Sequence, residues 1–372
     1  MKDNKMEITK LFSEYKLGDT ILNNRIVMAP MTRSRAINNI PNEMMALYYK
    51  QRATAGLIIT EGTSPSPNGL GYTSIPGIYS KEQVNGWTTV TEAVHKNGGK
   101  IFVQLMHTGR VGHPENLPKG AYLLAPSAVS AGSQIWTYSS SMQSMPVPKE
   151  MTIAEITSTK NEFVAASINA IEAGFDGVEL HSANGYLLEQ FLSAVSNQRT
   201  DQYGGSIKNR ARFVLEVAAA VADAIGKEKT GIRFSPYGAS NGLGYYDEIE
   251  AEYEYIATEL NKIGLVYIHL VDHSSMGAPE VPNKVKKMIR AAFKNTLILS
   301  GGYEVERAER DLLENSADLI AFGRQFINNP DFVIRLQNNL PVSQKIDNTT
   351  FYSGGKKGYI DYPTYEEENV TL

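Results

Sequence analysis

Short apolar segments alternate along this chain with longer segments of helical periodicity. The short segments are rich in Ile, Val, Leu and Phe and lack a strict alternation of apolar and polar residues, which is typical of parallel strands buried on both faces. They predict eight strands, over residues 25–30, 56–62, 100–105, 174–181, 231–236, 267–272, 296–301 and 317–323.

The segments between these strands repeat apolar residues at helical spacing, and many begin near an acidic residue, Ser or Thr and end near Gly or Asn. They predict helices over residues 45–55, 80–97, 153–173, 207–224, 248–263, 283–293 and 303–315. Strands that alternate with helices in this way favour one (β/α)8 TIM barrel. A doubly wound sheet is the main alternative, but no Gly-x-Gly-x-x-Gly sequence follows the first strand.

The remaining segments complete the predicted fold. No linker rich in Pro, Gly or Ser divides the chain, so residues 1–372 are predicted to form a single domain. Segments 106–149 and 182–206 are too long for plain connections, and such excursions after strands three and four would cover the active end of a barrel. Turn sequences at 16–19 and 22–24 predict an N-terminal hairpin that closes the opposite end.

Composition excludes several classes of function. The 372 residues carry a net charge of −4, which gives no sign of a nucleic-acid or membrane surface. The lack of cysteine excludes thiolate catalysis, disulfides, iron–sulfur clusters and Cys-ligated zinc. The start of the chain shows no apolar core of signal-peptide length, and no later segment approaches a membrane span. A cytoplasmic location is therefore expected.

The end of the fourth predicted strand carries three groups suited to catalysis. His181 and Asn184 can together donate two hydrogen bonds to one carbonyl oxygen, and the phenol of Tyr186 can donate a proton. At the end of a buried parallel strand these side chains would project into a pocket. The alternative is that His181 and Asn184 only cap the strand and its loop.

The ends of the last two predicted strands suit a phosphate group. Ser300-Gly301-Gly302 follows strand seven, and Gly323-Arg324 follows strand eight. Backbone N–H groups and a helix N-terminus can cradle a phosphate there, and the guanidinium of Arg324 can bind it with two hydrogen bonds. The alternative is that the glycines form tight turns and that Arg324 makes a surface ion pair.

The other strand ends supply Thr32, Gln104 and Arg233 but few carboxylates. These groups suit a planar heteroaromatic ring with several carbonyl and ring-nitrogen acceptors. A guanidinium is costly to leave unpaired inside a barrel. Arg233 therefore either forms a structural ion pair, with Glu61 or Glu179, or stabilises an anionic reduced flavin. We favour the second interpretation.

Two further features have structural interpretations. His269, Asp272 and His273 lie around strand six, but no further ligand is evident, so no metal site is expected there. The segment 197–210 is rich in charge and glycine, and we expect it to be a rigid loop that holds the His181 segment.

Several long motifs occur in order over nearly the whole chain. They are Ala29-Pro30-Met31-Thr32-Arg33, the His181–Tyr186 segment, the segment 197–210 and the segment 358–363. Together they resemble the Old Yellow Enzyme family of FMN-dependent ene-reductases, and most of all its classical branch, which contains N-ethylmaleimide and oxophytodienoate reductases. Thr32 stands where the thermophilic-type branch carries Cys, and the lack of cysteine excludes the iron–sulfur dienoyl-CoA reductases.

The resemblance implies roles for individual residues. It implies that Thr32 bonds the flavin near N5 and O4, that His181 and Asn184 hold the activating oxygen of the substrate, and that Tyr186 donates a proton. The residues implied to line the isoalloxazine ring are Ala29, Pro30 and Gly62, with Gln104 and Arg233 at its pyrimidine edge. Those implied at the ribityl-phosphate end are Ser300, Gly301, Gly302, Gly323 and Arg324, and those implied to wall the substrate site are Tyr72 and Tyr352.

The resemblance also implies the reaction. It implies an FMN-dependent NAD(P)H oxidoreductase that reduces the activated C=C bond of α,β-unsaturated carbonyl compounds, by hydride transfer from flavin N5 and protonation by Tyr186. FMN is expected to be bound and NADPH or NADH to be the reductant; loop residues such as Arg110 and Lys119 only hint at NADPH. The expected partner is an electron-poor alkene, with no nucleic acid and no membrane, and the chain is expected to be a monomer or homodimer.

Other functions stay open. The same site could reduce nitrate esters or nitroaromatics, and a non-catalytic flavin-binding sensor is a further alternative. A barrel hydrolase or aldolase without flavin would need paired carboxylates or a strand-borne Lys at the mouth, and neither is present in convincing form.

Overall fold

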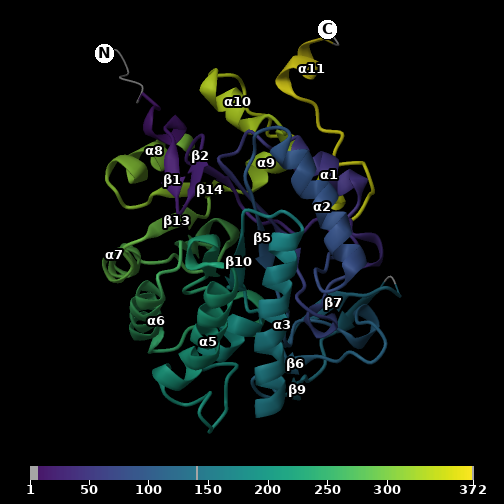
Figure 1. Ribbon diagram of the computed structural model, residues 1–372, viewed down its shortest axis with the longest axis vertical. Helices are drawn as coiled ribbons and strands as arrows, with labels where there is room; N and C mark the ends of the chain where they lie inside the picture. Colours follow the sequence, from purple (N-terminus) through teal and green to yellow (C-terminus); the bar gives the residue numbers. More distant parts are fainter. Residues whose placement is uncertain (1–6, 140, 371–372) are drawn as a thin grey trace.

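The computed structural model describes residues 7–139 and 141–370, and the predicted barrel is confirmed. Eight parallel strands close on themselves, each hydrogen-bonded to the next along the chain and the last to the first (Figure 1). All of their residues are buried, as expected where helices cover the outside and side chains fill the inside. The strands are β3 (Ile26–Met28), β4 (Leu57–Thr63), β5 (Ile101–Leu105), β10 (Gly177–Ser182), β11 (Thr230–Phe234), β12 (Tyr267–Val271), β13 (Thr296–Ser300) and β14 (Leu319–Phe322).

The seven predicted helices are also confirmed. From α1 to α7 each covering helix contacts the next around the barrel, and Figure 1 shows α3, α5, α6 and α7 in this order. A capping box begins α3, because Thr152 and Glu155 each bond the backbone of the other. The helices are α1 (Glu43–Lys50), α2 (Lys81–His95), α3 (Ile153–Glu172), α5 (Ile207–Ile225), α6 (Ile249–Ile263), α7 (Asn283–Ala292) and α8 (Val305–Leu313).

The predicted N-terminal hairpin is formed by β1 (Tyr15–Leu17) and β2 (Thr20–Leu22). Leu17 and Leu22 are fully buried in an apolar cluster that includes Leu57, Tyr267 and Leu319, the first residues of β4, β12 and β14. The hydroxyl of Tyr15 bonds that of Thr296, which opens β13, at 2.8 Å. The hairpin therefore closes the N-terminal end of the barrel, and the opposite end is left for the long loops.

The two excursions contain short elements that their sequences did not reveal. The first holds a small parallel pair, β6 (Leu124–Ala125) with β9 (Lys149–Glu150), and an antiparallel pair, β7 (Gln134–Trp136) with β8 (Met142–Ser144). The second holds the helix α4 (Leu187–Leu192). After the last strand come α9 (Arg324–Asn328), α10 (Phe332–Gln337) and α11 (Tyr365–Val370).

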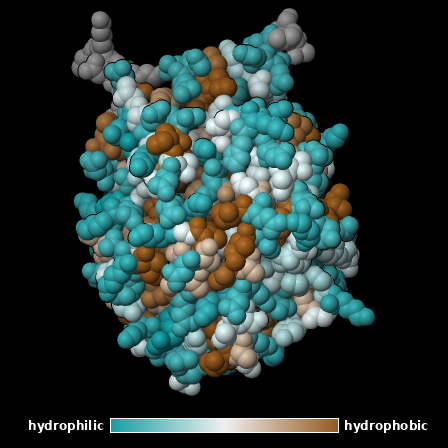
Figure 2. All heavy atoms as spheres, in the orientation of Figure 1, coloured by the Kyte–Doolittle hydropathy of each residue, from teal (hydrophilic) through white to brown (hydrophobic). Residues whose placement is uncertain are grey.

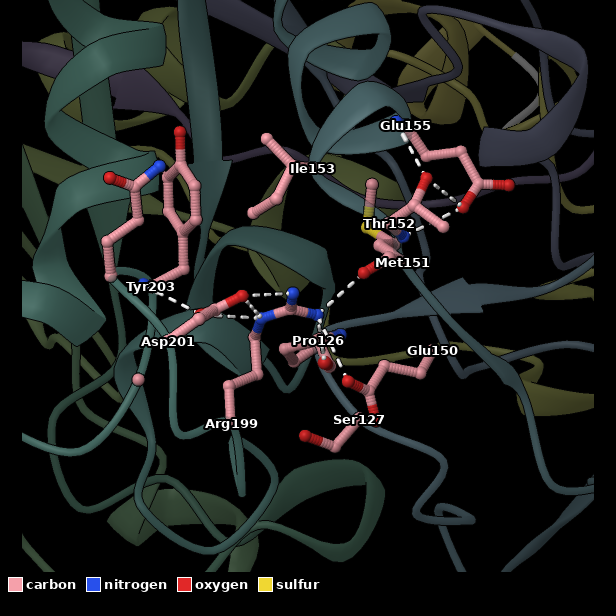
Figure 3. Close-up of polar contacts among 12 residues, drawn as sticks. Pro126, Ser127, Glu150, Met151, Thr152, Ile153, Glu155, Arg199, Asp201 and Tyr203 are labelled. Atoms are coloured by element: carbon pink, nitrogen blue, oxygen red, sulfur yellow. Dashed lines mark hydrogen bonds and ion pairs between the residues drawn. The ribbon is translucent and has the colours of Figure 1, made fainter.

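Arg199 ties the two excursions together (Figure 3). Its guanidinium lies between them, donates to the carbonyl oxygens of Pro126 at 2.9 Å and Met151 at 2.6 Å, and forms an ion pair with Asp201. The Arg199 side chain is only 6% exposed, so these bonds have little competition from water. The bonds that Arg199 makes to Pro126 and Met151 thus fix the loop 197–210 against the excursion after strand three.

The face of the molecule seen in Figure 2 is largely hydrophilic. Figure 2 shows one face on which apolar side chains form small groups among hydrophilic ones. Among the described residues, no helix is both long and apolar enough to cross a membrane.

Candidate active site

A cavity of about 730 Å³ opens at the C-terminal ends of the barrel strands, the end that the hairpin leaves free. Most of the residues singled out from the sequence meet there. Those that line the cavity are Ala29, Pro30, Thr32, Gln104, His181, Asn184, Tyr186, Arg233, Ser300, Gly301, Gly302, Gly323, Arg324 and Tyr352. They come from six of the eight strands or the loops that directly follow them, and from the C-terminal segment.

Two of the singled-out residues lie behind this lining. A Cβ at Gly62 would come within 2.4 Å of Met106 Sδ, so the glycine makes room for Met106, which does line the cavity. Tyr72 reaches the site through its hydroxyl, which lies 3.0 Å from the hydroxyl of Tyr186. Gly62 and Tyr72 thus shape the cavity through a neighbour.

His181 is a buried imidazole whose Nδ1 has no hydrogen-bond partner within the described part of the chain. Burial lowers its pKa well below the ordinary value, and the charge of Arg233 lowers it further. The ring is therefore neutral near pH 7 and has one N–H to offer. It packs edge-on against the ring of Tyr186, with centroids 4.8 Å apart.

Asn184 is held in one orientation by its neighbours. His273 Nε2 lies 2.7 Å from Asn184 Oδ1; because a carboxamide oxygen only accepts, the imidazole donates. The backbone is in the left-handed region, with φ of 60°, and its N–H donates to the hydroxyl of Ser235. Asn241 donates to its carbonyl oxygen at 2.8 Å. The Nδ2 amide group of Asn184 is thereby left to act as a donor towards a ligand.

Tyr186 carries its proton at neutral pH. The side chain is 8% exposed, and burial, with the nearby Tyr72, raises its pKa well above the ordinary value of 10. Burial also raises the pKa of Tyr72. The hydrogen-bonded pair of phenols is therefore neutral, and Tyr186 can act as a proton donor but not as a resident base.

Arg233 is the unpaired charge of the site. Its Nε is buried without a hydrogen-bond partner in the described residues, and neither acid proposed from the sequence forms an ion pair with it. Glu61 instead accepts the backbone N–H groups of Arg33 and Ser34. Glu179 accepts from Gln104 and His269. A guanidinium left in this state at a cavity wall is suited to an anionic or carbonyl-rich ligand.

The strand-seven and strand-eight ends form a smooth backbone cradle. Gly301 has φ of 117°, and a Cβ there would come within 1.9 Å of the carbonyl oxygen of Asp272. Only glycine fits this position. At Gly323 an added Cβ would lie 3.6 Å from Met31 Sδ and 4.0 Å from Ala29 Cβ, both on the cavity wall. The exposed Arg324 follows at the start of α9.

The C-terminal segment supplies a wall that sequence reasoning placed only in part. Phe351 and Tyr352 line the cavity, and Tyr352 is 66% exposed at its rim. Arg33 and Arg35, from the loop after β3, both donate to the carbonyl oxygen of Phe351, at 3.0 and 2.7 Å. The signal available in the sequence was the run of arginines after strand one, which the family motif covers only to Arg33.

His273 is the clearest site residue that the sequence interpretation missed. The cluster around strand six does not act as a unit: His269 bonds Glu179, Asp272 forms an ion pair with Lys286, and His273 bonds Asn184. Arg110, considered for NADPH, is 1% exposed and donates to carbonyl oxygens within the loops, including that of Asn241.

Comparisons with known proteins agree with this geometry. The family model for the NADH:flavin oxidoreductase / NADH oxidase family matches residues 10–343. A putative 12-oxophytodienoate reductase from Oryza sativa subsp. japonica is 40% identical over 357 residues, which cover 95% of this chain and 97% of that protein. Morphinone reductase in complex with tetrahydroNAD has a TM-score of 0.91 at 42% identity, over 96% of this chain and 98% of that one.

A further solved structure, an old yellow enzyme homologue from Zymomonas mobilis, has a TM-score of 0.90 at 38% identity and covers 95% of this chain and 99% of its own. The resemblance inferred from the sequence motifs is confirmed by these matches, as is an enzymatic role. The chain belongs to the NADH:flavin oxidoreductase / NADH oxidase family, with old yellow enzyme relatives, and is a flavin-dependent reductase.

Proposed function

We propose that this enzyme binds FMN, is reduced by NAD(P)H and reduces the activated C=C bond of α,β-unsaturated carbonyl compounds. The observation that carries the proposal is the meeting of two sets of groups in one cavity. One set is the unpaired guanidinium of Arg233 beside Gln104, and the other is His181, Asn184 and Tyr186.

The cavity fits FMN on several independent grounds. Arg233 offers unpaired donors to the carbonyl-rich pyrimidine edge of a flavin, and its charge would stabilise the anionic reduced form. The glycine cradle at Gly301 and Gly302, with Arg324 nearby, provides for the phosphate end. Thr32, Ala29 and Pro30 would then line the ring. Bound FMN would supply the redox chemistry, accepting hydride from the nicotinamide and passing it to the β-carbon of the alkene.

The residues of the chain have three tasks in the proposed reaction. His181 and the Nδ2 group of Asn184 bind the carbonyl oxygen of the substrate and stabilise the negative charge that develops on it. Such donors contribute about 3 kcal/mol each to catalysis. Tyr186 then gives its proton to the α-carbon, and its phenol is reprotonated from solvent before the next cycle. Because His273 occupies Asn184 Oδ1, the Nδ2 group of Asn184 is left to donate to the substrate oxygen.

The nicotinamide would use the same cavity as the alkene, in turn. A complex with tetrahydroNAD is known for morphinone reductase, and an analogous complex is proposed for this chain. Arg110 is not available for the 2′-phosphate of NADPH, because its guanidinium is buried and used by loop carbonyl oxygens.

The visible spectrum of the purified protein tests the proposal. A flavin band should bleach on anaerobic addition of NADPH or NADH and return on addition of 2-cyclohexenone, with cyclohexanone as the product. A protein that has no flavin and cannot be reconstituted with FMN would overturn the cofactor assignment. A flavin that bleaches but is not reoxidised by any of several enones would overturn the substrate class alone.

A further inference from the structure

A single buried carboxylate lies beneath the cavity and joins two of its walls. Glu179, on β10, is fully buried in the barrel. One of its oxygens lies 2.8 Å from Gln104 Nε2, on the neighbouring strand β5, and the other lies 2.8 Å from His269 Nδ1, on β12. His269 Nε2 in turn lies 3.0 Å from the hydroxyl of Ser300. Gln104 and Ser300 both line the cavity.

The protonation of this chain of groups follows from their surroundings. Burial alone would raise the pKa of Glu179, but the His269 imidazole, Arg233 and Gln104 outweigh it, so the pKa is lowered. Burial lowers the pKa of His269. At neutral pH the pair is therefore a carboxylate and a neutral imidazole. A carboxylate only accepts hydrogen bonds, which requires that both partners donate to it.

Hydrogen-bond direction is then fixed along the whole chain. Gln104 must turn its NH2 group to Glu179, which leaves its Oε1 as an acceptor. His269 must place its proton on Nδ1, which leaves Nε2 unprotonated. The Ser300 hydroxyl also lies 3.2 Å from the carbonyl oxygen of Leu270, but its one proton must point to Nε2, because two lone pairs would otherwise face each other across 3.0 Å. The lone pairs of the Ser300 oxygen are then the groups left for a ligand. Arg233, on the same cavity, can only donate.

We propose that Glu179 is a positioning residue that sets the donor and acceptor pattern of the flavin site. It makes Gln104 an acceptor for the ring N–H of the flavin and Ser300 an acceptor for a ribityl hydroxyl, while Arg233 donates to the carbonyl edge. The inference rests on the proposed binding of FMN and extends it, because Glu179 touches no ligand and acts only through its two partners.

The isosteric variant Glu179→Gln tests this role, because its side chain carries one NH2 group that cannot accept from Gln104 or His269. We expect the apoprotein to bind FMN about 10- to 100-fold more weakly, the loss of one to two hydrogen bonds to a buried group. Fluorescence quenching of FMN gives the affinity. In FMN labelled with ¹⁵N at N3, the N3–H resonance should shift upfield and its proton should exchange faster with water.

A double-mutant cycle separates this role from general damage to the fold. If Glu179 acts through Gln104, the effects of Glu179→Gln and Gln104→Leu on affinity should be far from additive. Should Glu179→Gln fail to fold, His269→Asn replaces it: asparagine keeps a donor for Glu179, but its side chain is too short to present an acceptor to Ser300 as well. That variant should weaken FMN binding and leave the N3–H resonance in place.

The outcomes are distinct. Wild-type protein that does not bind FMN would overturn the proposed function. Wild-type protein that binds FMN, with a Glu179→Gln variant of unchanged affinity and unchanged N3–H resonance, would overturn the role of Glu179 alone. Additive effects in the cycle, or a shifted N3–H resonance in His269→Asn, would also overturn it.

Discussion

The role of a single side chain in this cavity depends on whether it donates or accepts a hydrogen bond. Asn184 is the clearest case, since a carboxamide can present either a donor or an acceptor to a ligand. Its Oδ1 is taken by His273, and its backbone is held at a positive φ by Ser235 and Asn241. The neutral His181 beside it has one proton to give. The pair is thus prepared to stabilise negative charge on an oxygen.

The phenol of Tyr186 should matter for one half of the reaction only. In Tyr186→Phe we expect alkene reduction to slow by about 10²- to 10⁴-fold, the usual contribution of a general acid. Flavin reduction by NAD(P)H needs no proton donor and should stay within about twofold of wild type. Anaerobic stopped-flow measurement of each half-reaction checks this. Equal losses in both would contradict the assigned role.

His273 should be replaceable by another donor but not by an apolar side chain. 4-Hydroxybenzaldehyde, whose phenolate can sit between His181 and Asn184, is a suitable probe. We expect His273→Leu to weaken its binding about 2- to 10-fold, the worth of one net hydrogen bond. His273→Gln keeps an N–H group at a similar reach and should bind it nearly as tightly as wild type.

Spectral titration of the bound flavin with the probe gives both dissociation constants. Equal weakening in the two His273 variants would mean that the imidazole acts through its bulk rather than through its donor.

These residues show which parts of the site could be predicted from the sequence and which could not. His181, Asn184 and Tyr186 lie within six positions and follow one strand, so their shared pocket was predictable. His273 stands 89 positions from Asn184 and belongs to the loop after a different strand. Which of two loops turns towards the other depends on their packing, and periodicity says nothing about that.

At the scale of elements, the barrel strands position the site and the loops decide its shape. All eight strands and the seven covering helices could be predicted, because each carries an apolar pattern of sufficient length. The elements missed are of two to six residues: β6 to β9, α4, and the helices after β14. They are too short to show a period, and side chains from elsewhere, such as Arg199, fix the loops that hold them.

The turn after β14 gives a prediction that separates ligand binding from folding. In Gly323→Ala the new methyl group meets Met31 Sδ at an ordinary 3.6 Å, so the protein should fold with unchanged thermal stability in the absence of FMN. The methyl group would point among cavity-lining residues, and crowding of this kind costs about 1–3 kcal/mol, or about 5- to 150-fold in FMN affinity.

The matched control is Gly244→Ala, where the added methyl group meets nothing within 4 Å. It should leave both FMN affinity and stability unchanged. A Gly323→Ala variant that binds FMN like wild type would show that the cofactor does not approach this turn.

At the scale of the whole molecule, buried ionisable groups make stability depend on pH in two opposing ways. Burial raises the pKa of Glu61, Glu189 and Glu252 to about 7. A raised pKa means that the folded state holds the proton more tightly than the unfolded state. The resulting contribution to the free energy of unfolding is fully present below the ordinary value of 4.5 and is lost as pH rises through about 7. Burial lowers the pKa of His107 to about 3 and of His273 to about 4. The contribution of these two histidines to the free energy of unfolding is fully present above pH 6.5 and is lost as pH falls.

Because these trends oppose each other, the pH profile of the wild type alone will not reveal either one, and a variant must isolate one group. Glu189 lies on α4 and accepts from the Gly185 N–H and the Ser235 hydroxyl, beside the Asn184 turn. Glutamine there keeps the shape of the neutral acid and cannot ionise. A change in a carboxyl pKa from 4.5 to about 7 corresponds to about 3 kcal/mol.

We therefore expect the free energy of unfolding of Glu189→Gln, relative to wild type, to improve by up to about 3 kcal/mol between pH 4.5 and pH 8. The sign follows because wild type bears the cost of a buried charge only at the higher pH. Urea unfolding of both proteins at several pH values measures the difference, with the exposed Glu306→Gln as the control that should show none. Parallel profiles for wild type and Glu189→Gln would mean that the buried carboxyl is already ionised at pH 5, because its three donors, Gly185, Ser235 and Tyr253, outweigh its burial.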